Sequence, residues 1–338
     1  MPIIAAPEPG SLGNRFRSPE SAGRSAVPHG ATAHLGLTYA IAEGYRELGM
    51  DVYVPSGRTT PVPCVVWIRG GAWLSGDRRY FPDIWPPGAV LDTLISRGYA
   101  VATIDYRHSR EASFPAQLHD VKSAVRYLRH FAGELGIDPL RLAAWGESAG
   151  GHLAALVGLV SGRLDLEGEE GVPGTDSGVA AVIDWYGLSD MTIMPPFHDP
   201  AELAASGLDP AEYPEEPLDT VLAGIADRNA AERDLSPVTH VSASAPPFLV
   251  VHGEADALVP LSQSELLRDR LRAAGSRVEY SAVPGADHGW IGAELEPLVD
   301  EGIAFLDSVL RPRPGSAARL GDDRPAPADA GGNDAQRR

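Results

Sequence analysis

The chain has very little cysteine and almost no lysine, and each shortage excludes a class of chemistry. Cys64 is the only cysteine in 338 residues, so an intramolecular disulfide and a cysteine-rich metal site are both excluded. Because Cys64 lies in the apolar stretch 62–68, we expect it to be a small core residue. Lys122 is the only lysine, and this scarcity excludes most lysine-based covalent catalysis.

Positive charge and long apolar runs are also scarce. The formal net charge is -18 at pH 7, which repels phosphate backbones and anionic lipid surfaces, so nucleic-acid and membrane partners are not expected. No stretch reaches the roughly 18 apolar residues of a membrane span. Residues 1–16 lack the charged start and apolar centre of a secretory signal, which predicts a cytoplasmic protein. The composition does not indicate an oligomeric state.

The domain organisation is predicted from composition along the chain. Residues 1–35 are rich in proline, glycine, serine and alanine, and residues 311–338 contain almost nothing that could anchor them to a core, so both ends are predicted to be mobile. A single catalytic domain is expected over 36–310. Residues 191–236 form an unusually long connection, which is predicted either to cover a pocket or to be a surface excursion without a role in binding.

Between the two ends, short apolar runs alternate with helical patterns. The clearest helical pattern follows Pro115 and stops at Gly133, and a second begins at Ser262 and stops at Gly275. The predicted strands are 46–53, 64–68, 100–105, 141–144, 180–185, 248–252 and 278–282. This alternation predicts an α/β fold with a mostly parallel sheet and helices on both faces.

The run Gly146–Gly150 matches the nucleophile-elbow pattern Gly-x-Ser-x-Gly, with Ser148 at its centre. It follows a predicted strand and precedes a predicted helix, which is the context that this motif requires. The turn is so tight that side chains beside the serine would collide, which explains both flanking glycines, and Gly151 lets the helix pack closely. The motif predicts that Ser148 is a catalytic nucleophile.

A serine hydroxyl needs a histidine base, which is held in turn by a carboxylate. Asp256 and His288 each follow a predicted strand, at the edge where open α/β sheets place their ligands. Asp287, Glu254 and Asp190 are rivals for the acid. Asp256 is favoured, because a residue adjacent to the histidine cannot easily reach its far ring nitrogen. Other histidines have ordinary structural explanations: His119, His130 and His152 lie on predicted helices, and His252 lies at the end of a core strand.

Acyl transfer also needs donors for the developing oxyanion. The run Arg69–Trp73 follows an early core strand, where such a loop belongs, and the amides of Gly71 or Ala72 together with that of Ala149 are the expected donors. The candidate pocket residues near these positions are Arg69, Trp73, Glu147, Tyr186, Met191 and Phe197. The alternative for the aromatic members of this set is a plain core role.

Together these pieces resemble the α/β-hydrolase serine esterases with a His-Gly-Gly-x-Trp oxyanion loop, that is, the BD-FAE-type and hormone-sensitive-lipase-like carboxylesterases. The likeness spans roughly residues 40–310 and includes further short motifs: Asp105-Tyr106-Arg107, Asp184-Trp185-Tyr186-Gly187, Leu235-Ser236-Pro237 and His252-Gly253. The resemblance implies the α/β-hydrolase fold and hydrolysis of small esters through an acyl-enzyme, without a cofactor or metal.

One position departs from that family pattern. Arg69 stands where these families usually carry histidine, and Ala72 replaces a glycine or aromatic residue. Arg69 is expected either to support the loop or to reach the pocket and bind a substrate carboxylate. Three other functions stay open: an amidase of the arylformamidase kind, an acyltransferase, and a non-catalytic binding protein on this fold.

Overall fold

The structure is a computed structural model, and its described residues are 24–27, 30–42, 44, 46–197 and 216–311. They form a nine-stranded sheet with the order β1-β2-β3-β5-β4-β6-β7-β8-β9. The first three strands and β5 pair antiparallel, and the pairs from β5 through β4 to β9 are parallel. The strands are β1 Arg24–Val27, β2 Ala31–Ile41, β3 Glu47–Pro55, β4 Val62–Ile68, β5 Ala100–Ile104, β6 Ile137–Glu147, β7 Ala181–Trp185, β8 Phe248–Gly253 and β9 Val278–Val283.

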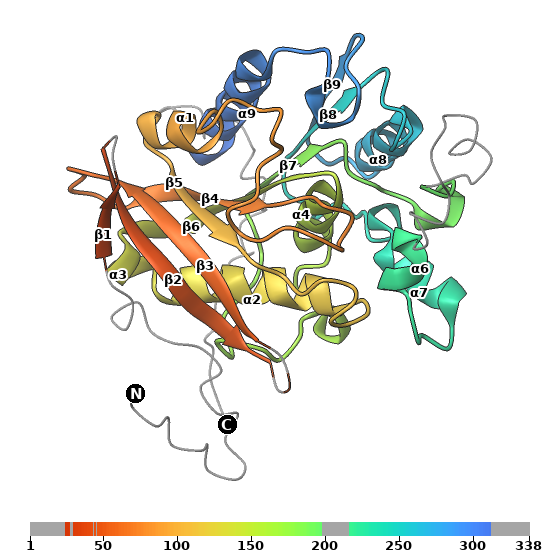
Figure 1. Cartoon of the computed structure of the whole chain (residues 1–338), viewed down its shortest axis with the longest axis horizontal. Helices are drawn as coiled ribbons and strands as arrows, with labels where there is room; N and C mark the ends of the chain where they lie inside the picture. The colour runs from red at the N-terminus through yellow and green to blue at the C-terminus, as the bar shows by residue number, and fades with distance from the viewer. Residues whose placement is uncertain (1–23, 28–29, 43, 45, 198–215, 312–338) are drawn as a thin grey trace, which may run out of the picture.

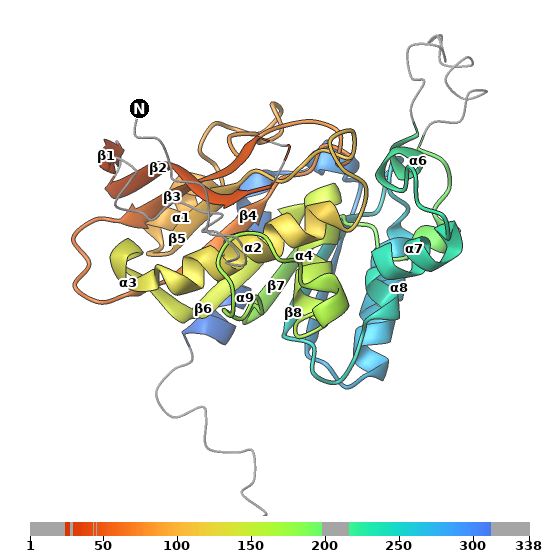
Figure 2. The same cartoon turned by 90° about the horizontal axis from the view of Figure 1, so that it is seen from below.

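Helices cover both faces of the sheet. In Figure 1, α1 and α9 lie above the sheet and α2 lies below it, and Figure 2 shows α6 and α7 beside α8 at one end. The helices are α1 Leu91–Ser96, α2 Ala116–His130, α3 Ala132–Leu135, α4 Ala149–Leu159, α6 Pro217–Val221, α7 Arg228–Leu235, α8 Leu261–Ala273 and α9 Leu295–Leu310.

The core is divided in two by the sheet, because neighbouring strand residues point to opposite faces. On β4, Val66 belongs to the part of the core that includes side chains of α2, α4 and α8, whereas Val65 and Trp67 belong to the part that includes those of α1 and α9. All seven residues of β4 are buried, as expected for a central strand covered on both faces. This two-sided burial explains why the parallel strands are continuous apolar runs in the sequence.

The α/β-hydrolase fold predicted from the sequence is confirmed, and each of the seven predicted strands overlaps an observed one. Two strands were missed. β1 and the first part of β2, residues 31–35, fall inside the predicted mobile segment 1–35, so the structure has strands at 24–27 and 31–35 where the sequence predicted none. β2 is rich in small and polar residues, and it is held by antiparallel pairing with β3 from Ala31 to Ile41, which its own pattern does not reveal.

Other parts of the predicted organisation lie outside the described residues. These are 1–23, 28–29 and 312–338 at the ends, and 198–215 within the long connection. The described parts of 191–236 contain a short 3₁₀ turn, Met191–Ile193, followed by α6 and α7.

Candidate active site

Ser148 sits at the sharp turn between β6 and α4, as its motif predicts. Its backbone has φ 56° and ψ −123°, which is a left-handed conformation that an L-residue adopts only under constraint. The Ser148 amide donates to the carbonyl oxygen of Trp185, at 2.9 Å, on the neighbouring strand β7. The side chain is therefore presented at the carboxyl edge of the sheet.

The glycines around Ser148 have the steric reason that the sequence suggested. A Cβ at Gly146 would lie 2.1 Å from the carbonyl oxygen of Gly150, and one at Gly150 would lie 2.0 Å from that of Ile68. At Gly151 it would lie 2.4 Å from a carboxylate oxygen of Asp184. The neighbours at 146 and 150 are backbone atoms that cannot move aside, so the turn can form only with glycine there.

Three predicted catalytic side chains meet at this edge. The hydroxyl Oγ of Ser148 is 3.0 Å from His288 Nε2, and His288 Nδ1 is 2.8 Å from Asp256 Oδ2. Because the carboxylate can only accept, Nδ1 carries the ring proton and Nε2 of the neutral ring is free to accept from the Ser148 hydroxyl. Asp256 is fully buried, and the His288 side chain keeps 19% of its surface exposed, so the base borders solvent.

The rival carboxylates are occupied elsewhere. Asp287 accepts from its neighbour's amide, His288 N, at 2.7 Å and from Ala257 N at 2.9 Å. Asp190 accepts from the amide and hydroxyl of Thr192. Glu254 is exposed, and Asp256 is the carboxylate that contacts the His288 ring.

The predicted oxyanion loop has an unusual backbone. Gly71, Ala72 and Trp73 have φ of 94°, 53° and 59°, so three consecutive residues are left-handed. The amides of Leu74 and Ser75 both donate to the carbonyl oxygen of Gly71, which closes the turn. Within the described part of the chain, the amides of Gly71, Ala72 and Ala149 have no hydrogen-bond acceptor. These three amides therefore remain available as donors, and their role toward an oxyanion stays a prediction.

Arg69 supports this loop from beneath and does not line a pocket, which corrects one of the two expectations for it. The side chain is 1% exposed, and its guanidinium carbon lies 3.9 Å from the centre of the Tyr106 ring. The guanidinium donates to the carbonyl oxygens of Gly70 at 3.0 Å, Ser75 at 2.5 Å and Tyr106 at 3.3 Å. Arginine can hold three carbonyls at once because its donors form a planar fork, and this explains how the loop tolerates the loss of histidine.

Glu147 holds the same loop from the elbow. It is buried, and its carboxylate accepts from the amide of Gly70. Burial raises the pKa of Glu147 to about 8, although the Gly70 amide and the Arg69 charge oppose this. Glu147 is therefore a support for the oxyanion loop and not a pocket wall.

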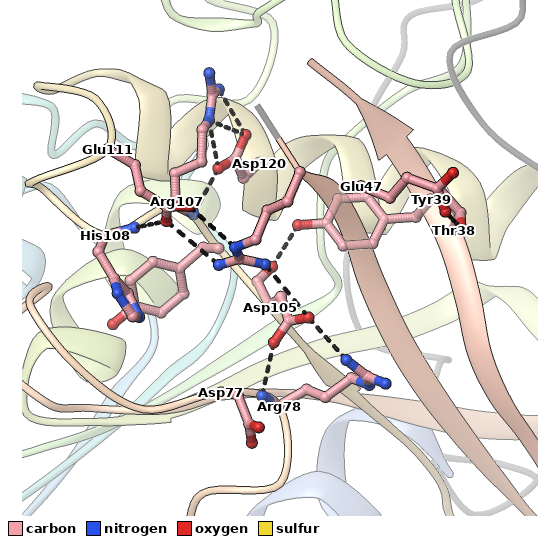
Figure 3. Close-up of polar contacts among 12 residues, drawn as sticks. Thr38, Tyr39, Glu47, Asp77, Arg78, Asp105, Arg107, His108, Glu111 and Asp120 are labelled. Carbon is pink, nitrogen blue, oxygen red and sulfur yellow. Dashed lines mark hydrogen bonds and ion pairs between the residues drawn. The ribbon is translucent and has the colours of Figure 1, made fainter. Parts of the chain in front are cut away.

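A polar network anchors the segment that continues from the loop. Asp105, the residue after β5, accepts from the amide of Arg78 at 2.8 Å and from its guanidinium at 2.9 Å (Figure 3). The Tyr39 hydroxyl donates to the carbonyl oxygen of Asp105, and His108 Nε2 lies 2.8 Å from the carbonyl oxygen of Gly76. Figure 3 labels the side chains of both Tyr39 and His108. These contacts tie 69–78 to strands β2 and β5.

The remaining candidate pocket residues are mostly buried. Trp73 and Tyr186 are fully buried, and Met191 is 2% exposed, so they belong to the core around the site. The Tyr186 ring lies 4.7 Å from the His288 ring, and Phe197 packs edge-on to Trp73 at 6.5 Å. The plain alternative, a core role, thus holds for Trp73 and Met191, and Tyr186 also flanks the histidine.

Sequence reasoning missed the segment that packs against the turn following the histidine. Trp85 Nε1 donates to the carbonyl oxygen of Gly289 at 2.8 Å, and Ile84 is 59% exposed beside it. Both residues, with Trp290 and Ile291, line part of a cavity of about 830 Å³. The signal in the sequence was the density of proline and aromatic residues in 80–87, but nothing in that pattern indicates its distant partner.

The comparisons with known proteins agree with this geometry. The BD-FAE family profile matches residues 50–271. The chain belongs to the BD-FAE family. Esterase LipC of Mycobacterium tuberculosis is 34% identical over 75% of this chain. Among solved structures, a truncated carbohydrate esterase from gut microbiota has a TM-score of 0.68 and 28% identity, covering 84% of this chain and 99% of its own. The propionate-bound esterase Est2 of Thermogutta terrifontis has a TM-score of 0.63 and 26% identity, covering 83% and 94%.

The chain spans only part of the length of the M. tuberculosis relatives that it matches. The chain spans 60% of LipC and 59% of LipQ, another M. tuberculosis esterase that is 30% identical. Within the described residues, no helix is long and apolar enough to cross a membrane. The same residues contain no group of three or more histidine, cysteine or carboxylate side chains that could hold a metal ion.

Proposed function

We propose that the chain is a serine carboxylic-ester hydrolase that acts on small esters through an acyl-enzyme. The observation that carries the proposal is the hydrogen-bonded series from Ser148 through His288 to Asp256, placed at a nucleophile elbow. The names of the BD-FAE relatives, which include esterases of bacteria, support the same reaction class.

The proposed acyl transfer uses these side chains in turn. His288 Nε2 takes the hydroxyl proton as Ser148 Oγ attacks the ester carbonyl carbon, and the buried Asp256 carboxylate stabilises the imidazolium that forms. The amides of Gly71 or Ala72 and of Ala149 are the proposed donors to the oxyanion. His288 then gives its proton to the leaving alkoxide, and the acyl group stays on Ser148. Water attacks this ester with His288 again as base, which releases the carboxylic acid and restores the serine.

Removal of the nucleophile is the direct test of this function. Ser148→Ala should fold normally and lose about a millionfold in kcat on p-nitrophenyl acetate, because no other group can form the acyl-enzyme. Ser161→Ala, an exposed serine two residues beyond α4, is the matched control and should keep full activity. A Ser148→Ala protein with a tenth of wild-type activity would refute the proposal.

The choice of acid is tested separately. Asp256→Asn should lower kcat about ten-thousandfold, since an amide favours the wrong ring tautomer of His288. Asp287→Asn and Glu254→Gln should have mild effects, because Asp287 accepts from the Ala257 amide, Glu254 is exposed, and the ring nitrogen faces Asp256.

The substrate range is tested with two panels. p-Nitrophenyl esters of increasing acyl length measure the acyl preference, and N-formyl anilides measure amidase activity against the ester rate. We expect the short esters to be the best substrates and the anilides to be slow.

No proposed step uses a metal, so activity in EDTA should equal that in buffer. The cytoplasmic location stays a prediction, and fractionation of expressing cells is its test.

A further inference from the structure

A second histidine contacts the acid of the triad. His252 is the penultimate residue of β8 and is fully buried, and its Nε2 lies 3.3 Å from Asp256 Oδ2. The same carboxylate oxygen faces His288 Nδ1 at 2.8 Å. Two imidazoles therefore share one oxygen of Asp256, and the reaction proposed above uses only one of them.

The surroundings of His252 fix which ring nitrogen carries the proton. Nε2 is 2.9 Å from the carbonyl oxygen of Val259, which can only accept, so Nε2 must be protonated. Nδ1 is 2.6 Å from the hydroxyl of Ser264 on α8, and this hydroxyl can donate to it. A neutral ring with its proton on Nε2 satisfies both sides. Nε2–H therefore donates to the Val259 carbonyl oxygen, and Asp256 Oδ2 lies 3.3 Å from the same nitrogen.

Asp256 is the carboxylate that receives this donor, and every side of it is occupied. Its Oδ1 accepts from the amides of Leu258 at 2.9 Å and Val259 at 2.8 Å, while Oδ2 faces the two histidines. Burial by itself raises the pKa of Asp256, but the hydrogen bonds from His252 and His288 outweigh it and leave the pKa well below its ordinary value. The group stays ionised and its plane cannot rotate.

Other titratable groups near the His252 ring come from β7 and its end. Burial raises the pKa of Asp184 to about 7, and the electrostatic effect of the nearby His252 ring opposes this rise. The Tyr186 ring lies 6.5 Å from the His252 ring and 4.7 Å from the His288 ring. Of the titratable side chains Asp184, Tyr186 and Asp256, it is Asp256 that lies in polar contact with the His252 ring.

We propose that His252 is a positioning residue that acts through Asp256. Its Nε2–H fixes the orientation of the carboxylate and takes up part of its charge, and in this way it sets the basicity of His288. The inference rests on the serine-hydrolase function proposed above. Without the donor, Asp256 would stabilise the His288 imidazolium more strongly, so the acidic limb of kcat/KM would move to higher pH. The less firmly oriented acid would also lower kcat, with little change in KM.

Two amide substitutions separate the two sides of the ring. His252→Gln can place its NH₂ near the position of Nε2 and keep the donor to Asp256, whereas His252→Asn reaches only the Ser264 side. We expect His252→Asn to raise the midpoint of the acidic limb by about half a pH unit or more and to lower kcat about tenfold. His252→Gln should return both values close to those of the wild type.

A stability control removes the structural explanation. Leu128→Ala, in the α2 core, should lower the melting temperature without moving the midpoint. An unchanged midpoint in a folded His252→Asn protein, or equal shifts in the Asn and Gln variants, would overturn the role of His252. Failure of the proposed serine-hydrolase function would give a different result, because the Ser148→Ala protein would then hydrolyse esters at the wild-type rate.

A measurement on the unaltered chain covers the case in which His252→Asn does not fold. The ¹⁵N shifts of the histidine rings in the full-length wild type should show His252 protonated at Nε2 and bare at Nδ1 at pH 7 to 8. The opposite tautomer would contradict the proposal, since a bare Nε2 cannot donate to Asp256.

Discussion

The nucleophile elbow, Gly146–Gly151, and the oxyanion loop, Arg69–Ser75, both hold left-handed residues next to the reacting atoms, but they are held in different ways. The elbow is fixed by close approach of backbone to backbone, and glycine is the only residue that fits its flanks. The loop has non-glycine residues at Ala72 and Trp73 with positive φ, and it is held by the side chains of Arg69 and Glu147. The strained backbone of the elbow is therefore held by its immediate neighbours, whereas that of the loop is held by contacts that include distant parts of the chain.

The largest effect should come from adding one methyl group to the elbow. In Gly150→Ala the new Cβ would lie 2.0 Å from the Ile68 carbonyl oxygen, so the turn must deform. Since a misplacement of about 1 Å at a reacting group costs about a hundredfold, kcat should fall at least that far. Measurement of kcat and of the melting temperature tests this.

Gly133→Ala on α3 is the matched control for the elbow, because nothing lies within 4 Å of its new Cβ. It should leave kcat unchanged and stabilise the fold by up to about 1 kcal/mol, as glycine to alanine does in a helix. Equal losses in the two variants would show that the elbow has no special steric requirement.

An intermediate effect should come from removing the support of the loop. Arg69→Met loses the guanidinium contacts with the carbonyl oxygens of Gly70, Ser75 and Tyr106. The oxyanion donors would lose their fixed positions, so kcat should fall about a hundredfold, the scale for loss of one such donor, with little change in KM. Arg69→Lys, which keeps the charge but not the planar fork, should recover only part of the rate.

Arg69→Met also tests the alternative role of Arg69, in which its side chain binds a substrate carboxylate. If this side chain bound a substrate carboxylate, Arg69→Met would raise KM for esters that carry a carboxylate and leave neutral esters unaffected. We expect the same fall in kcat on both kinds of ester, because the arginine is buried beneath the loop.

The smallest effect concerns the proton on Glu147. Its folded-state pKa of about 8 lies above the ordinary value of 4.5, so the folded chain holds this proton more tightly than the unfolded chain. That stabilisation is fully present below pH 4.5 and is lost as the pH rises through 8. Glu147→Gln keeps an acceptor for the Gly70 amide without the ionisation.

The wild type should therefore lose stability relative to Glu147→Gln between pH 5 and pH 9, by on the order of 4 kcal/mol, since each unit between the unfolded and folded pKa is worth about 1.4 kcal/mol. Guanidinium unfolding at several pH values measures the difference. Parallel curves for the two proteins would mean that Glu147 does not change its charge in this range.

The contrast between elbow and loop also shows what the sequence can predict. The elbow glycines, Ser148, Asp256 and His288 follow strands whose apolar runs are plain, and local sterics fix the residue types, so their places could be predicted. The contact of Arg69 with Tyr106 joins residues that are far apart in the sequence. His252 and Asp256 are close in the sequence, but only the fold turns their side chains toward each other. Neither contact could be predicted from the sequence. The pairing of β2 with β3 is likewise tertiary, and small and polar residues in β2 concealed it.

The central claim is that Ser148 is the nucleophile, and covalent labelling tests it most directly. The full-length protein is treated with a fluorophosphonate, residual esterase activity is followed, and the modified peptide is identified by mass spectrometry. The account predicts one adduct, on Ser148, that forms in proportion to the loss of activity, and no adduct there in His288→Ala on the same time scale, because the serine then lacks its base. Complete inhibition with the adduct on another residue, or full hydrolysis by protein wholly labelled at Ser148, would contradict it.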